Sequence, residues 1–310
     1  MNYTRKLPAT GSRVAQALCF AGIAFLTFLS LPSARGATVS LAASDVLGET
    51  SFNTGLHWSN AAAPAATNNY FTSNFILRTP PNSSSYPFGG ASLTVNNTNG
   101  YSQGLLYKGS GSSGTITITN LILAGGFISH AMSAADTFRL AGNLTVASNS
   151  TIYAKQGPII LVAPVSGSAT LTNLLADSAS GTLSFSNASN TFTGNIVNNG
   201  YFTLLSGANL NFVIGDSGVN NRFNSPPNST ALFSGRFVFD LSSASTNLGS
   251  AWAVGTNVNQ SYGSTFSADG FARVGGGNGA GVWQAATNGT FYSFDTASGV
   301  LQVVSSLSTN

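Results

Sequence analysis

The side chains able to do acid–base chemistry are few and scattered. The chain of 310 residues holds eight carboxylates, which are Asp45, Glu49, Asp136, Asp177, Asp216, Asp240, Asp269 and Asp295. Enzymes that cleave glycosidic bonds need two carboxylates roughly 5 to 10 Å apart. In the middle of the chain only Asp136 and Asp177 are available, with Arg139 and Lys155 as bases. These two carboxylates could meet if successive coils stack, but solvated turn aspartates are the simpler interpretation, and we expect no catalytic residue.

Other kinds of site have weaker signals. His57 and His130 are the only histidines, and no HExxH or similar zinc spacing occurs. We expect His57, beside Trp58, to pack within an end region of the fold. Serine is abundant, but no GxSxG motif stands at a strand–turn–helix position. The glycine-rich stretch 275–279 has no following lysine and is predicted to be a hairpin loop. The sequence therefore predicts no metal and no cofactor.

The pattern of the chain after residue 36 is that of short strands. Asn, Ser, Thr and Gly are abundant, charged residues make up 6% of the composition, and no amphipathic helix pattern appears. The turn at Asn198–Gly200 is expected to reverse the chain through residues that tolerate positive φ. Runs that alternate apolar and polar residues predict strands at 91–95, 115–123, 143–146, 151–154, 159–162, 169–175, 182–185 and 202–205.

Phrases such as GTITITN, GNLTVASN, SATLTN and GTLSFSN recur every 15 to 30 residues or so, as in solenoids. The stretch from Asn190 to Leu210, NTFTGNIVNNG followed by LLSGANL, resembles the autotransporter-associated β-strand repeat of bacterial surface passengers. The string LHWSNAAAPAATNNYFTSNFILRTP and the closing GRFVFDLSSAS to GVLQVV resemble secreted Verrucomicrobia-like proteins that carry such repeats. This resemblance implies a right-handed parallel β-helix of the passenger type. The chain departs from the family in its ending, SLSTN, and we expect no translocator barrel. It implies almost nothing about activity.

The first residues have the pattern of a secretory leader. Arg5, Lys6 and Arg13 precede an apolar run at 14–31, and Ala34-Arg35-Gly36 fits a small-x-small cleavage site. We expect residues 1–36 to be a signal peptide, so that the secreted chain begins ATVSL. Four of the eleven basic residues leave with it, and the seven that remain against eight acids give a net charge of −1. The mature chain has no cysteine, and its charge argues against nucleic acid as a partner.

Three sections are expected in the mature chain. Residues 37–87 are predicted to be an N-terminal cap, 88–219 a β-solenoid and 230–304 a C-terminal β unit. Aromatic side chains crowd that last unit, and we expect them to form its core rather than a platform for sugar stacking. They are Trp252, Tyr262, Phe266, Phe271, Trp283, Phe291, Tyr292 and Phe294.

These features predict an all-β protein that is secreted or exposed on a bacterial cell surface, with a structural or adhesion-type role and no catalysis. The alternatives are a carbohydrate-active β-helix, which is a polysaccharide lyase or hydrolase, and a carbohydrate-binding module in the C-terminal unit. The expected partner class is an extracellular polysaccharide or a cell-surface matrix. No membrane span is expected after cleavage of the leader, and the sequence leaves the oligomeric state open.

Overall fold

The computed structural model describes residues 36–81, 84–96, 103–109, 114–132, 136–177, 180–256 and 259–308. Within these ranges the chain is built from strands and has no helix, so the all-β prediction is confirmed. Residues from Gly36 onward form one compact unit. The predicted signal peptide lies almost wholly outside the described residues. No helix of the described part is long and apolar enough to cross a membrane.

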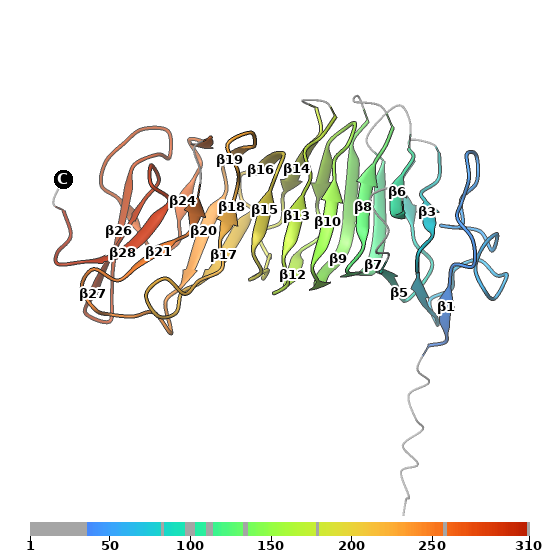
Figure 1. The fold of residues 1–310 in the computed structure, drawn as a ribbon, viewed down its shortest axis with the longest axis horizontal. Coiled ribbons are helices and arrows are strands. Elements are labelled where there is room, and N and C mark those ends of the chain that lie inside the picture. The colour runs from blue at the N-terminus through green and yellow to red at the C-terminus, as the bar shows by residue number, and fades with distance from the viewer. Residues whose placement is uncertain are drawn as a thin grey trace, which may run out of the picture. The chain divides into compact units, whose positions relative to one another are not determined.

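A twelve-stranded sheet has only parallel pairs, and most of its strands follow one another in chain order (Figure 1). Its main path consists of β1 (Thr38–Ser40), β2 (Asn69–Phe71), β5 (Ser92–Val95), β7 (Thr115–Ala124), β9 (Phe138–Ser148), β11 (Ile159–Leu161), β14 (Thr182–Phe185), β16 (Tyr201–Leu204), β19 (Thr230–Phe233) and β23 (Gln260–Tyr262). Beside this path, β4 (Tyr86–Pro87) pairs with β7, and β12 (Val165–Gly167) pairs with β9.

Two further sheets are also parallel. The eight-stranded sheet consists of β3 (Ile76–Arg78), β6 (Gly104–Tyr107), β8 (Phe127–His130), β10 (Ser150–Tyr153), β13 (Leu171–Asn173), β15 (Ile196–Asn198), β18 (Phe223–Asn224) and β22 (Gly255–Thr256). The three-stranded sheet consists of β17 (Asn209–Val213), β20 (Arg236–Asp240) and β24 (Ser267–Ala268). Successive visits of the chain to each sheet lie side by side, an arrangement consistent with a β-helix.

The predicted parallel stacking between residues 86 and 210 is confirmed, and each of the eight predicted runs overlaps an observed strand. The parallel sheets extend beyond residues 88–219, the range predicted for the solenoid, in both directions along the chain. Strands from residues 37–87 begin both large sheets, and parallel pairing continues through β22, β23 and β24. Strand β18 lies within 220–229, where the sequence pattern is interrupted by two prolines.

Apolar side chains stack in columns because equivalent positions of parallel strands lie opposite one another. One column in the twelve-stranded sheet runs Ile116, Leu140, Leu161, Phe185, Leu204, Phe233, Tyr262. The residues predicted to face inward are all at most 1% exposed: Leu93, Val95, Ile116, Ile118, Leu144, Val146, Leu183 and Phe185. Burial of this kind stabilises the fold by roughly 25 cal/mol per Å² of apolar surface.

A column of the eight-stranded sheet changes from aliphatic to amide side chains. It begins with Leu77, Leu105, Ile128 and Ile152 and continues with Asn173 and Asn198. Asn173 Nδ2 donates to Asn198 Oδ1 at 2.8 Å and to the Tyr201 carbonyl at 3.0 Å. Asn198 repeats the pattern, since its Nδ2 donates to Ser225 Oγ and to the Thr230 carbonyl. This ladder joins the eight-stranded sheet to backbone carbonyl groups of β16 and β19 in the twelve-stranded sheet.

The prediction that Asn198–Gly200 turns through positive φ is wrong, because none of these residues has positive φ. Asn198 ends β15 and is fully buried in the amide ladder. Gly200 is needed for a different reason: a Cβ there would press against the carbonyl of Leu174 on a neighbouring pass of the chain. Close backbone approach, rather than backbone handedness, therefore explains the glycine.

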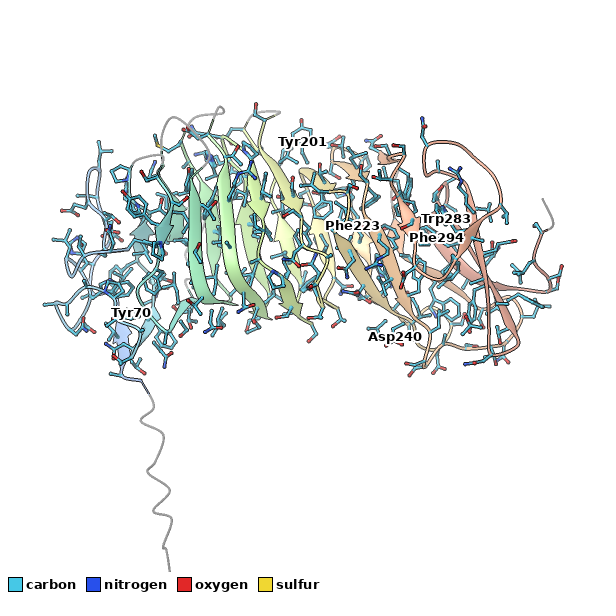
Figure 2. All side chains as sticks on the ribbon, turned by 180° about the vertical axis from the view of Figure 1, so that it is seen from behind. Tyr70, Tyr201, Phe223, Asp240, Trp283 and Phe294 are labelled. Carbon is cyan, nitrogen blue, oxygen red and sulfur yellow. The ribbon has the colours of Figure 1, made fainter. Side chains whose placement is uncertain are left out.

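The C-terminal residues form a five-stranded antiparallel sheet in the order β21 (Ala251–Ala253), β28 (Val300–Val304), β27 (Thr290–Asp295), β26 (Val282–Thr287), β25 (Ala272–Arg273). The loop between β25 and β26 contains the glycine-rich stretch, so the predicted hairpin is confirmed. Trp283 and Phe294 are paired across β26 and β27 and lie close together in Figure 2.

Most of the aromatic side chains crowded near the C-terminus are buried. Six of the eight are at most 8% exposed: Trp252, Tyr262, Phe266, Trp283, Tyr292 and Phe294. Phe237 and Phe239 of β20 contact Phe294 with ring centroids 5.8 and 5.3 Å apart, so the antiparallel sheet packs on the parallel strands. These contacts favour a core role over a platform for stacking sugars.

Candidate functional site at the edge of β3

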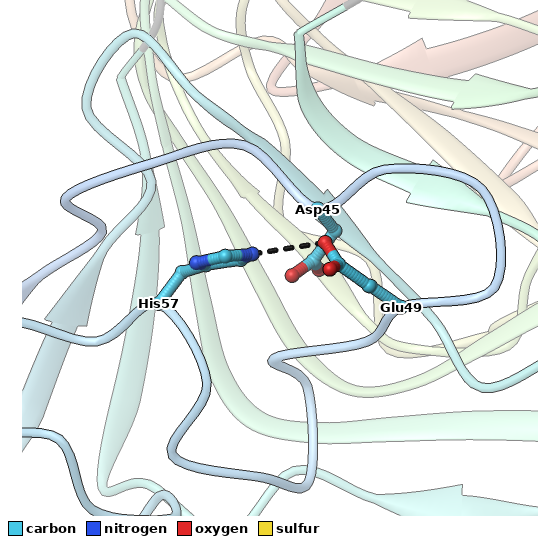
Figure 3. A group of neighbouring side chains, drawn as sticks. All are labelled: Asp45, Glu49 and His57. Atoms are coloured by element: carbon cyan, nitrogen blue, oxygen red, sulfur yellow. Dashed lines mark hydrogen bonds and ion pairs between the residues drawn. The ribbon is translucent and has the colours of Figure 1, made fainter.

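One group of residues in the described part of the chain has the composition of a metal site. Asp45, Glu49 and His57 offer ligand atoms that all lie within 4.8 Å of one another (Figure 3). They lie in the long connection between β1 and β2, where the sequence has many Gly, Ala, Asn and Ser residues and no strand pattern. Carboxylate and imidazole groups in such an arrangement could bind a divalent cation or transfer protons.

The Asp45 carboxylate is already engaged by the protein. Its side chain is buried, Oδ1 accepts a hydrogen bond from Ser51 Oγ at 2.6 Å, and Oδ2 accepts from the Ser51 amide at 2.9 Å. Oδ2 also accepts from the Arg78 amide at 2.8 Å. These donors supply the stabilisation that a buried carboxylate requires.

Glu49 and His57 hold the loop around Asp45. Glu49 Oε2 accepts from His57 Nε2 at 3.0 Å and from the Val46 amide at 3.0 Å (Figure 3). The hydrogen bond from His57, followed by that from the Val46 amide, lowers the pKa of Glu49. The expectation that His57 packs in an end region matches its half-buried position next to Trp58, but the contact with Glu49 could not be expected from sequence spacing.

The loop satisfies the outward-facing backbone groups of β3, which has a strand partner only on its other side. The Ile76 amide donates to Ser44 Oγ, and the Ile76 carbonyl accepts from the Asp45 amide. The Arg78 amide donates to Asp45, and the Arg78 carbonyl accepts from Thr50 Oγ1 at 2.7 Å. Unpaired strand edges invite intermolecular pairing, so these four bonds protect β3.

The edge of β1 is covered by the same connection. The Ser40 carbonyl accepts a hydrogen bond from the Ser59 amide, and the Ser40 amide donates to Ser59 Oγ. The Ala42 amide donates to the His57 carbonyl, and Leu41 and Trp58 form an antiparallel bridge. The carboxylates of this cluster therefore stabilise backbone, and Glu49 Oε1 is their one oxygen without a hydrogen bond among the described residues.

His130 and Asp136 lie in the interior between the large sheets. His130 Nε2 donates to the Asp136 carbonyl at 2.9 Å, and His130 Nδ1 accepts from the Met132 amide at 3.4 Å. The His130 ring is fully buried and packs on Tyr107, with ring centroids 5.0 Å apart. Burial is the main cause that lowers the pKa of His130. The ring is thus a neutral packing residue of the core.

The lowered pKa predicts a loss of stability in mild acid. Below about pH 6.5 an unfolded histidine binds a proton that the folded state resists, so the free energy of unfolding falls with pH until His130 protonates in the fold. We expect the melting temperature of the wild type to fall between about pH 7.5 and 5.5. His130→Gln should flatten this slope. Equal slopes in wild type and His130→Gln would contradict the assignment.

The other predicted acids lie apart from one another. Asp177 accepts from Tyr153 Oη at 2.7 Å and pairs with Lys155 at 3.6 Å on the surface. Asp269 is exposed and pairs with Arg236 at 3.3 Å. Asp216 is exposed, and its backbone carbonyl accepts from Trp252 Nε1. Asp136 is buried, whereas Asp177 is exposed, so the two predicted candidates do not share one solvent-accessible site.

Arg139, the remaining predicted base, lies in β9 and is half-buried. Its backbone is paired with Ile160 and Thr115 of the neighbouring strands. The structure thus brings together Asp45, Glu49 and His57, which the sequence did not group, and separates the acids that it offered as candidates. In comparisons with known proteins, no protein-family model, no curated protein and no solved structure matches this chain.

Proposed function

We propose that this protein is a secreted or cell-surface structural or adhesion-type protein of a bacterium, without catalytic activity. The observation that carries the proposal is the use made of the polar and charged side chains. Asp45, Ser44 and Thr50 bind the backbone of an edge strand, and Asn173 and Asn198 bind backbone carbonyl groups of the other large sheet. Functional groups that are used to hold strands together favour a scaffold over a reaction centre.

The handedness of the fold and the capping of its two ends are also proposals. We infer a right-handed parallel β-helix whose first strands are capped by the connection between β1 and β2. At the other end the five-stranded sheet is the second cap, and the hydrogen bond from the Gly255 amide to the Gly299 carbonyl supports this role. Capped ends keep a stack of parallel strands monomeric, because they leave less strand edge available for pairing.

Export is proposed on two grounds, the predicted leader and the resemblance of residues 190–210 to autotransporter-associated repeats. We propose cleavage after Gly36 and delivery to the cell exterior, where a polysaccharide or matrix is the partner. A chain without cysteine after residue 19 gains nothing from an oxidising compartment and must rely on its ladders and columns for stability. Sequencing the N-terminus of secreted material should read ATVSL.

The absence of catalysis is tested with single carboxylate replacements. Asp136→Asn, Asp177→Asn, Asp216→Asn and Asp269→Asn should each retain surface attachment, since an adhesive surface spreads its contacts over many polar side chains. Retention on a plant and algal polysaccharide panel, and release of reducing ends, are measured for each variant. Replacing a catalytic carboxylate would remove orders of magnitude in rate. Complete loss of an activity in one folded variant would establish a carbohydrate-active enzyme instead.

A further inference from the structure

A hollow of about 120 Å³ opens beside the edge of β3, between the loop that carries Glu49 and the end of β6. Its wall includes Arg78, Lys108 and Glu49 together with the apolar side chains Leu47, Pro81 and Met132. Small-molecule sites commonly combine apolar walls with a few polar groups that fix the ligand. Asp45 itself is not part of the wall, although Arg78 donates hydrogen bonds to it.

Parallel pairing brings the two cations of this wall together. Arg78 is the register partner of Leu106, and Lys108 follows Leu106 by two residues. Neighbouring strands are roughly 4.8 Å apart, so the two positive side chains start from adjacent passes of the chain. Charged residues make up only 6% of the sequence. Two like charges side by side destabilise a fold, whereas Ser, Thr or Asn, which are abundant elsewhere in this chain, would carry no such cost at these positions.

Neither cation forms an ion pair within the part of the chain that the structure describes. The ion pairs there are His57–Glu49, Lys155–Asp177 and Arg236–Asp269. Lys108 Nζ donates to the Ala131 carbonyl at 2.7 Å, and Arg78 Nε donates to the Asp45 carbonyl at 3.0 Å. Burial lowers the pKa of Lys108, and the charges of Arg78 and Lys155 lower it further. An anion in the hollow would relieve this repulsion.

Glu49 adds an acceptor to the wall that carries the two donors. Its Oε2 is engaged by His57 and Val46, and Oε1 takes part in no hydrogen bond among the described residues. Leu47 is 88% exposed at the mouth, where an apolar side chain can cover one face of a ring. A ligand that fits this set carries an anionic group and hydroxyl groups on a compact ring.

We propose that the hollow binds a carboxylate-bearing sugar unit of an acidic polysaccharide. The guanidinium of Arg78 and the ammonium of Lys108 donate to the sugar carboxylate, and Glu49 Oε1 accepts from a ring hydroxyl. Arginine suits this role because its planar fork matches a carboxylate with two parallel hydrogen bonds. The inference rests on the proposed attachment function and gives it a partner of defined chemistry.

The test is calorimetric binding of a polyuronate oligomer to the mature protein at low and moderate salt. A neutral oligosaccharide of equal length and a sulfated one are the comparison ligands. We expect the polyuronate to bind best, and its affinity to fall with salt because the contact is charged. Lys108→Gln and Arg78→Gln should each weaken it at least tenfold, since each removes a charge-assisted hydrogen bond.

Arg236→Gln is the matched control, because Arg236 is paired with Asp269 and is not part of the wall. Its affinity for the polyuronate should equal that of the wild type. Lys108→Arg, which keeps the charge, should retain binding, and melting curves verify that every variant folds. Equal affinity for the neutral oligomer, preference for the sulfated one, no binding at all or equal weakening by Arg236→Gln would overturn the site. If attachment persists without polyuronate binding, the proposed function stands and this inference fails.

Discussion

Replacing Gly142 with alanine is expected to destabilise the protein by about 4 kcal/mol or more, through backbone strain and overpacking together. Gly142 lies inside β9 with φ of 103°, a conformation that L side chains rarely adopt. An added Cβ would also overlap the carbonyl carbon and oxygen of Ile118 on β7. These are backbone atoms of a paired strand, so they cannot rotate out of the way as a side chain could. The pairing of β7 with β9 is irregular between Ile118 and Asn120, which is typical of a β-bulge.

Gly125→Ala separates the two causes. Gly125 also has positive φ, 89°, but nothing lies within 4 Å of a Cβ built on it. The free energy of unfolding of Gly125→Ala should therefore fall by the backbone strain alone, about 1 to 2 kcal/mol. Thermal unfolding followed by circular dichroism compares the variants. If Gly142→Ala melted within a degree or two of Gly125→Ala, the close approach of β7 and β9 at this point would be refuted.

Much of the fold could be predicted from local sequence pattern. Runs such as TITITN at residue 115 and TLSF at residue 182 alternate apolar and polar residues, and strands lie there. Their inward positions followed because period-2 alternation assigns one face of the strand to the core. Periodicity nearly excluded helix after residue 36, since the sequence there has no amphipathic pattern of period 3.6.

Other strands had no such pattern. Strands β6, GLLY, and β8, FISH, do not alternate, and every β6 residue is buried. Strand β15 ends in Asn198, a residue type that favours turns when only local propensity is considered. The amide ladder that places Asn198 in the core depends on Asn173 and Ser225, 25 and 27 residues away. These strands form because of pairing with strands that are distant in the sequence, and a short stretch of sequence carries no information about that pairing.

The candidate site was hidden for the same reason. Asp45, Glu49 and His57 are close in sequence, but their spacing matches no motif, and Arg78 reaches them only because β3 lies next to their loop. Arg78 and Lys108 are thirty residues apart and become neighbours through the pairing of β3 with β6. A signal was nevertheless present, since a sequence this poor in charge holds Asp45, Glu49, Arg78 and Lys108 between residues 45 and 108.

The most sensitive positions of the stacked columns are expected to be those without any solvent contact. Val146 in β9 is 1% exposed and lies opposite Leu123 on one side and Gly167 on the other. Val146→Asp places a carboxylate there with no positive partner in the column. An unpaired buried charge costs about 3 to 5 kcal/mol, so the melting temperature should drop strongly or the variant should fail to fold.

Val162→Asp is the matched control, because it makes the same chemical change at a valine that is 38% exposed after β11. Water can solvate this carboxylate, so the cost should stay within about 0.5 kcal/mol. Both variants are compared by urea denaturation at neutral pH and again near pH 4, where Val146→Asp should recover part of its stability as the carboxyl group takes up a proton. Equal stability of the two variants at neutral pH would show that Val146 does not face the core. It would also contradict the stacking of apolar side chains in columns across the parallel sheets.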